Sequence, residues 1–382
     1  MSAFLPRPSV LRLRERLAIR LALVSLSGIA LLLGAVGLAA WLAAASAGAA
    51  LQAIDHGLPV RTLAWIAVGL ALAWLASWGL GAMLRLAPRA EGVPLTRQSA
   101  EELFRLVDEL SERAGIPPLH HLRITEDINA AVVQRPSLGL GGRLRTELQI
   151  GLPLVHGLSP MQFGAVLAHE LGHIAAQRLG WCGWGAFLRA WWMRILDALA
   201  LNLPARLRWL ESRIDGYCRH MLRLARVEEL EADSVAARLV GAELVGQTLV
   251  ELSRKAHFLH HDYWPRHQAL RVAGCSSALR PYREMGCGFA TAYPCVALAC
   301  AQAVGDGECR PDPFHPSLRR RLRALRFAGQ GPATRPGTAA DQYLGGALPG
   351  LARVFDRAWE ELVHCKRHPM VAGRGGADEP RD

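Results

Sequence analysis

Two histidines and a glutamate form the pattern His169-Glu170-Leu171-Gly172-His173 near the middle of the chain. Residues four apart share one face of a helix, so both imidazoles can reach the same metal ion. Glu170 is displaced by one residue and can serve a water molecule beside that metal without taking a ligand position. Zinc suits such a nitrogen-rich site and keeps one coordination position open in catalytic centres. The spacing therefore predicts metal-assisted hydrolysis.

A third metal ligand is expected from the acidic, helix-forming stretch 226–239. The glutamates that compete for the role are Glu228, Glu229 and Glu231. Glu229 is favoured because Asp233 follows four residues later on the same face, beside the small residues Ala232 and Ala236. Asp233 can then orient a ligand histidine by a hydrogen bond. A solvated acidic face is the alternative interpretation of this stretch.

The first two ligands need a buried helix, and the sequence predicts one that begins at Ser159. Pro160 suits the first helical position, and Gln162 completes a capping box with Ser159. Apolar residues then recur at helical spacing, at Phe163, Val166, Leu167, Leu171 and Ile174. Two histidines and a glutamate would be costly on a buried helix without a purpose, which favours the metal site over a structural role.

The N-terminal region predicts membrane anchoring by two helices. Residues 21–54 and 62–84 carry no charge, and a membrane span needs ~20 apolar residues. The first span is expected at 21–45. The basic residues before it are Arg7, Arg12, Arg14, Arg16 and Arg20, and those after the second window are Arg85, Arg89 and Arg97. Only Arg61 lies between the windows, so both ends are expected in the cytoplasm, joined by a short external loop.

The composition sets limits on the remainder of the chain. It has 382 residues, of which 51% are hydrophobic and 20% charged, with a formal net charge of +11. This excludes a disordered protein and favours a folded domain with a few membrane spans. The eight cysteines include no C-x-x-C pair, which argues against a cysteine zinc site and favours reduced thiols facing the cytoplasm. No nucleic-acid-binding motif accompanies the arginines at 319–323, so nucleic acid is not expected as a partner.

Secondary structure after the anchor is expected to be mainly α with a small β-sheet. A helix is predicted at 99–114, followed by short strands at 122–125, 130–133 and 148–152. The segment 181–204 contains three charged residues, and two interpretations stay open for it: an interfacial helix on the bilayer, or a core helix. The uncharged run 285–305 is interrupted by glycines and a proline and is not assigned as a span.

Three motifs together resemble the gluzincin family of HtpX and the type I CaaX prenyl proteases, over about 101–325. They are Ala168-His169-Glu170-Leu171-Gly172-His173, Glu229-Leu230-Glu231-Ala232-Asp233, and Phe314-His315-Pro316-Ser317-Leu318 with Arg321 six residues after His315. The resemblance implies a zinc metallopeptidase. It implies that His315 and Arg321 lie near the active site and help to stabilise the transition state. It also implies that a substrate binds as an added strand beside 128–134.

These observations predict two N-terminal transmembrane helices followed by a gluzincin-type zinc metalloprotease domain. The predicted order is a basic cytoplasmic tail (1–20), two transmembrane helices (21–84), a linker (85–98), the metallopeptidase domain (99–326), a C-terminal helical extension (327–370) and a disordered tail (371–382). His169, His173 and Glu229 are expected to hold one Zn²⁺, with Glu170, His315 and Arg321 as catalytic residues. Asp233 is expected to orient a ligand histidine by a hydrogen bond, without binding the metal itself.

The predicted function is that of a membrane-anchored zinc endopeptidase in the bacterial inner membrane. Its catalytic domain would face the cytoplasm and cleave proteins or peptides, in membrane protein quality control, while the anchor contacts the lipid bilayer. The alternative is a catalytically silent, zinc-stabilised membrane adaptor that binds proteins without cleaving them. The intact Glu170 argues against this alternative, because a scaffold has no need of it.

Overall fold

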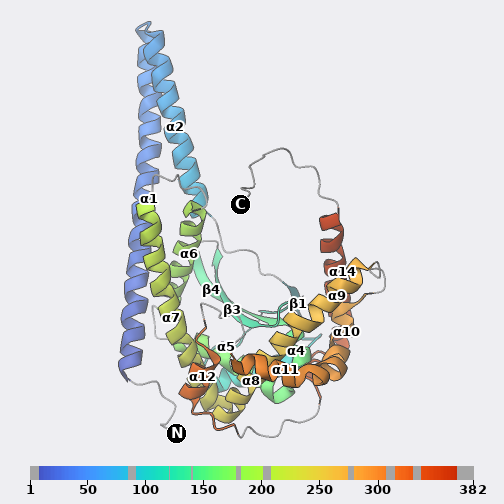
Figure 1. Cartoon of the computed structure of the whole chain (residues 1–382). Coiled ribbons are helices and arrows are strands. Elements are labelled where there is room, and N and C mark those ends of the chain that lie inside the picture. Colours follow the sequence, from blue (N-terminus) through green and yellow to red (C-terminus); the bar gives the residue numbers. More distant parts are fainter. Residues whose placement is uncertain are drawn as a thin grey trace, which may run out of the picture.

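The computed structural model describes residues 8–84, 92–119, 121–138, 141–177, 182–200, 208–273, 279–306, 315–329 and 337–367. In these ranges the chain is mostly helical, with one four-stranded sheet, and an apolar helical hairpin precedes the mixed domain (Figure 1). The predicted fold class is confirmed. The predicted disordered tail, 371–382, lies outside the described residues.

Helices α1 (Pro8–Asp55) and α2 (Pro59–Met83) form a long hairpin that projects from the rest of the molecule (Figure 1). At ~1.5 Å per residue, the 48 residues of α1 extend about 70 Å, more than twice the ~30 Å hydrocarbon core of a bilayer. Both helices are long and apolar enough to cross a membrane. The sequence predicts a first span at 21–45 after a basic tail, whereas the helix already begins at Pro8.

The first half of α1 is covered by two helices of the main domain, α6 (Cys182–Ala200) and α7 (Arg208–Val240) (Figure 1). Trp191 and Ile195 of α6 are buried in a cluster with Ile29 of α1 and Met83 of α2. The indole N–H of Trp191 donates to the carbonyl of Met83, at 2.9 Å. The described part of 181–204 thus packs one face on the two apolar helices of the hairpin, in a cluster separate from the main core; residues 181 and 201–204 lie outside the described residues.

The sheet has the strand order β1-β2-β4-β3. Its strands are β1 (Val93–Leu95), β2 (His121–Thr125), β3 (Ala130–Leu138) and β4 (Gly141–Gly151). The β2–β4 pair is parallel and the other two pairs are antiparallel. Strand β1 falls within the predicted linker. Three residues are too few to show a strand pattern in the sequence, and β1 forms by pairing with β2. Strand β3 lies at the edge of the sheet, with β4 as its one neighbour.

One hydrophobic core joins the sheet to the helices that follow it. Helix α3 (Glu101–Ala114) ends at Gly115, whose φ of 66° is in the left-handed region, in agreement with the predicted helix. The other helices are α4 (Leu152–Gly157), α5 (Pro160–Gln177), α8 (Ala242–Phe258), α9 (Trp264–Val272), α10 (Pro281–Cys287), α11 (Tyr293–Asp306), α12 (Leu318–Leu325), α13 (Ala339–Tyr343) and α14 (Leu348–Arg367). Short π- or 3-10-helical turns occupy Leu259–Tyr263, Gly288–Ala292 and Gly345–Ala347.

A third helical segment, Pro281–Gly305, is also long and apolar enough to cross a membrane. It comprises α10, the π-helical turn and most of α11, which continue one another through the glycines expected to interrupt them. Phe289 and Cys300 are buried against the core, whereas Leu298 is exposed. The segment therefore packs one face on the main domain and leaves an apolar face outward.

Candidate metal centre

Helix α5 carries the two histidines and starts as its sequence predicts. The backbone N–H of Ser159 donates to the Gln162 side chain at 3.2 Å, and the Ser159 hydroxyl lies 3.4 Å from the Gln162 N–H, so both halves of the capping box are present. Phe163, Leu167 and Leu171 are fully buried. This apolar face fixes the rotation of α5, and His169 and His173 consequently face α7.

Helix α7 approaches α5 closely at Gly172, between the two motifs. A Cβ on Gly172 would lie 3.0 Å from the carbonyl oxygen of Ala232 and 3.1 Å from its Cα. Ala232 and Ala236 are themselves fully buried. Small residues on both helices therefore permit a backbone approach that brings an acidic side chain of α7 within reach of the histidines.

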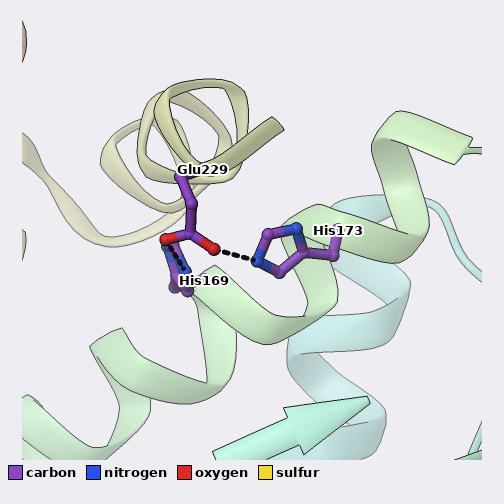
Figure 2. A group of neighbouring side chains, drawn as sticks. All are labelled: His169, His173 and Glu229. Atoms are coloured by element: carbon purple, nitrogen blue, oxygen red, sulfur yellow. Dashed lines mark ion pairs between the residues drawn. The ribbon is translucent and has the colours of Figure 1, made fainter. Parts of the chain in front are cut away.

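His169, His173 and Glu229 converge from the two helices (Figure 2). The Nε2 atom of His169 lies 3.5 Å from Oε2 of Glu229, and Nε2 of His173 lies 3.3 Å from Oε1. One potential ligand atom from each residue falls within 4.8 Å of the others. Oε2 of Glu229 is buried without a hydrogen-bond partner. Two imidazole nitrogens and a carboxylate are ligands that Zn²⁺ takes in catalytic sites, so this set fits that ion.

Asp233 lies one turn further along α7 and orients His169. The His169 Nδ1–H donates to Oδ1 of Asp233 at 3.0 Å, which leaves Nε2 as the free nitrogen facing Glu229. Arg321 binds both oxygens of this carboxylate, donating from Nε to Oδ2 at 2.8 Å and from Nη2 to Oδ1 at 2.6 Å. Asp233 is 1% exposed. A buried carboxylate thus connects the histidine to a buried arginine.

The residues of the His-Pro motif also reach the centre, from the start of α12 and the segment before it. His315 Nε2 lies 3.5 Å from Oε1 of Glu229, and Arg321 Nη1 lies 3.5 Å from Oε2. The side chain of His315 is 41% exposed, whereas that of Arg321 is 12% exposed. Phe314 lies outside the described residues. The structure therefore brings together six of the residues singled out from the sequence: His169, His173, Glu229, Asp233, His315 and Arg321.

A family model described as Peptidase family M48 matches residues 97–328, a span that contains every one of these side chains. The chain belongs to peptidase family M48. It is therefore a metallopeptidase, as its motifs predict, and the resemblance to HtpX and the CaaX proteases is consistent with this family. No curated protein and no solved structure matches the chain.

The three competing glutamates of the M48 chain point to different partners. Glu229 faces the histidines, whereas Glu228 lies 3.5 Å from Arg189 of α6 and Glu231 lies 3.1 Å from Arg14 of α1. The two flanking carboxylates are thus engaged on the side of α7 that faces α1 and α6. Neither arginine is foreseen from the sequence, because each stands on a different helix from the glutamate beside it and in no recognisable motif.

Opposing electrostatic effects act on the buried groups of the M48 centre. Burial lowers the pKa of His169, but Asp233 and Glu229 outweigh it and raise that pKa to about 9 in the metal-free protein. Burial raises the pKa of Asp233, but the hydrogen bonds from Arg321 and His169 outweigh it and hold that pKa at about 2. The pKa of Glu170 is raised, chiefly by burial. A carboxyl group with a raised pKa beside a metal centre is suited to accept and return protons.

A pocket of about 330 Å³ opens beside the histidines of the M48 centre. His169, Glu170 and His315 line one part of it, and Ile128 and Asn129, just before β3, line another. Its apolar wall comes largely from α8, through Val245, Thr248, Leu249, Leu252 and Ala256. The sequence does not single out these α8 residues, since their spacing is that of any amphipathic helix.

Proposed function

We propose that the chain is a membrane-anchored endopeptidase that binds one Zn²⁺ through His169, His173 and Glu229. The observation that carries this proposal is the convergence of two Nε2 atoms and one carboxylate, with His169 and the neighbouring Glu170 lining a pocket. A structural zinc site needs neither the pocket nor a neighbouring carboxyl group. Zinc bound there supplies Lewis-acid chemistry, since it polarises a carbonyl and makes water more acidic.

Glu170 is the general base in this proposal. It lines the pocket, and burial raises its pKa above that of an ordinary carboxyl group, which favours proton exchange with a neighbouring water. The carboxylate takes a proton from the attacking water and returns it to the leaving amine. Asp233 keeps the His169 Nδ1 proton in place, so that Nε2 stays available for the metal.

His315 and Arg321 have different roles in this proposal. Arg321 donates two hydrogen bonds to Asp233, so we infer that it holds that carboxylate in place and balances the charge of Glu229. His315 is more exposed and lines the pocket, and it is therefore the residue that we assign to the developing oxyanion. The role of His315 agrees with what the family resemblance implies, whereas Arg321, expected to stabilise the transition state, acts in this proposal through Asp233 and Glu229.

The substrate in this proposal is an extended, unfolded segment with an apolar side chain next to the scissile bond. Strand β3 is an edge strand whose N-terminal end adjoins the pocket, and pairing with an edge uses main-chain hydrogen bonds that tolerate varied side chains. Such tolerance suits the quality control of damaged membrane proteins. The α8 wall would accept an apolar side chain.

The membrane topology in this proposal places the catalytic domain in the cytoplasm of a bacterial inner membrane. Arg12, Arg16 and Arg20 lie on the half of α1 that the domain covers, whereas the far end of the hairpin carries Arg61 alone. This asymmetry follows the positive-inside rule. In spheroplasts, external protease should cut a tag inserted after Gly57 and spare one at the C-terminus.

Cleavage of casein by the detergent-purified chain tests the catalytic proposal, with Glu170→Gln as the control. The native chain should cleave, and Glu170→Gln should bind zinc without cleaving. Zinc binding without cleavage by either protein would favour the adaptor function. Glu229→Ala should lower zinc occupancy, and unchanged occupancy would reassign the third ligand.

A larger side chain introduced into the pocket tests which substrate side chains the pocket accepts. Ala256→Phe should shift cleavage from peptides with leucine or phenylalanine at the pocket toward those with alanine, by about 10-fold or more, because a few methylene groups supply that discrimination. An unchanged preference would mean that the substrate side chain next to the scissile bond does not occupy this pocket.

A further inference from the structure

The membrane helix α1 sends one buried side chain between the two helices that carry the metal-binding residues. Arg14 is 4% exposed, although its neighbours Arg12 and Arg16 are exposed. Its Nη2 donates to the carbonyl of Ala176 in α5 at 3.0 Å, and its Nε lies 3.1 Å from Oε2 of Glu231 in α7. A charged side chain is seldom buried unless it is paired, so this position needs an explanation beyond membrane topology.

The contact with α5 falls in the last turn of that helix, three residues after His173. The last four carbonyl groups of a helix have no partner within it, and a positive charge at this end is favourable. The last turn of α5 contains no basic residue of its own. Arg14 supplies the missing cation from a helix more than 150 residues away in sequence.

The contact with α7 is made two residues after Glu229, on the opposite side of the helix. Successive residues of a helix are rotated by about 100°, so Glu228 and Glu231 share a face that is turned away from Glu229 and Asp233. Arg189 of α6 adds a second connection on the same side. It lies 3.5 Å from Glu228, and its Nη1 donates to the carbonyl of Ala18 in α1 at 3.4 Å. Helix α7 is thus held between α1 and α5.

We propose that Arg14 is a positioning residue of the metal centre and that α1 is part of the catalytic apparatus as well as an anchor. The ligands His173 and Glu229 stand on different helices, and Arg14 connects those helices from behind. Without the charge of Arg14, the largely buried Glu231 would lose its ion-pair partner, and α7 would tend to move toward water. This inference rests on the proposed metal site.

The experiment uses the full-length protein in detergent and compares four variants with the native chain. They are Arg14→Gln, Arg14→Lys, the double variant Arg14→Gln/Glu231→Gln, and Arg16→Gln as the matched control on the exposed face of the same helix. Zinc affinity is measured by chelator competition, and the cobalt-substituted protein is examined by visible absorption. Cleavage of a soluble peptide then separates kcat from KM.

Arg14→Gln should weaken zinc binding by about 10-fold or more, the effect seen when groups that orient metal ligands are removed. It should also change the cobalt spectrum and lower kcat more than KM, while Arg16→Gln behaves as the native chain. Arg14→Lys should be intermediate, and the double variant should recover part of the loss, because it leaves no unpaired buried carboxylate.

Two results would overturn the inference. One is an Arg14→Gln protein with the zinc affinity and cobalt spectrum of Arg16→Gln. The other, which applies even where Arg14→Gln does not fold, is a folded double variant or Arg14→Lys protein with unaltered zinc affinity and kcat. A native chain that binds no zinc would instead refute the proposed function, and the two failures are therefore distinguishable.

Discussion

The replacement Asp233→Asn tests the charge arrangement behind the metal centre. It keeps the size of the side chain and removes the negative charge that joins His169 to Arg321. The partners lower the pKa of Asp233 from 3.8 to about 2. One pKa unit corresponds to about 1.4 kcal/mol, so the net effect of the partners and the opposing burial favours the ionised form by roughly 2.5 kcal/mol. Because the folded-state pKa is lowered, this stabilisation is present above pH ~4 and is lost as the pH falls toward 2.

The loss of stability in the Asp233→Asn protein should exceed roughly 2.5 kcal/mol, because Arg321 would lose its hydrogen-bonded carboxylate while the next carboxylate, that of Glu229, lies 3.5 Å away. Breaking a buried ion pair by removing one partner costs about 3–5 kcal/mol. With roughly 2–4 °C per kcal/mol for a domain of this size, Tm of the metal-free protein should fall by about 5–20 °C. Zinc affinity should fall by roughly 10- to 100-fold.

Thermal unfolding in detergent with EDTA, followed by zinc titration, measures both effects. Asp356→Asn is the matched control, since Asp356 is also buried but accepts a hydrogen bond from the Tyr282 backbone, which asparagine can keep. The double variant Asp233→Asn/Arg321→Gln should be more stable than Asp233→Asn alone. Equal behaviour of Asp233→Asn and Asp356→Asn would refute the reasoning, as would a double variant that is less stable than the single one.

Three further predictions concern packing, pH and metal removal. Gly172→Ala should destabilise the protein by about 1–3 kcal/mol and weaken zinc binding, because its Cβ would meet the Ala232 backbone at 3.0 Å; Gly164→Ala, with open space around it on the same helix, should be neutral or stabilising in the same unfolding assay. Burial lowers the pKa of His156 to about 4, so the metal-free protein should lose up to ~3 kcal/mol of stability as the pH falls from 6.5 to 4, and His156→Gln should abolish that loss in unfolding scans. The pKa of His169 is raised to about 9, so its contribution in the metal-free protein is present below pH 6.5 and is lost toward pH 9; the rise in Tm on adding Zn²⁺ should therefore grow over this range, and a constant rise would contradict the assignment.

Local patterns were sufficient to predict the N-terminal hairpin and the helix that carries the two histidines. The capping box at Ser159, the apolar spacing of α5 and the two histidines four apart depend on contacts within one helix, so a short window of sequence contains them. The two uncharged windows predict the hairpin for the same reason, because solvation by lipid acts on each segment separately. The family followed from motifs of this local kind.

Which side chains contact one another across these elements depends on how segments distant in sequence pack together. Glu228, Glu229 and Glu231 are equivalent by composition, and the rotation of α7 between α5 and α1 turns one toward the histidines and the others toward Arg14 and Arg189. Likewise, α1 starts earlier than its apolar window because α6 and α7 cover its first turns. Several of these contacts join residues more than 150 positions apart, and their energies depend on shapes and charges that no single segment contains.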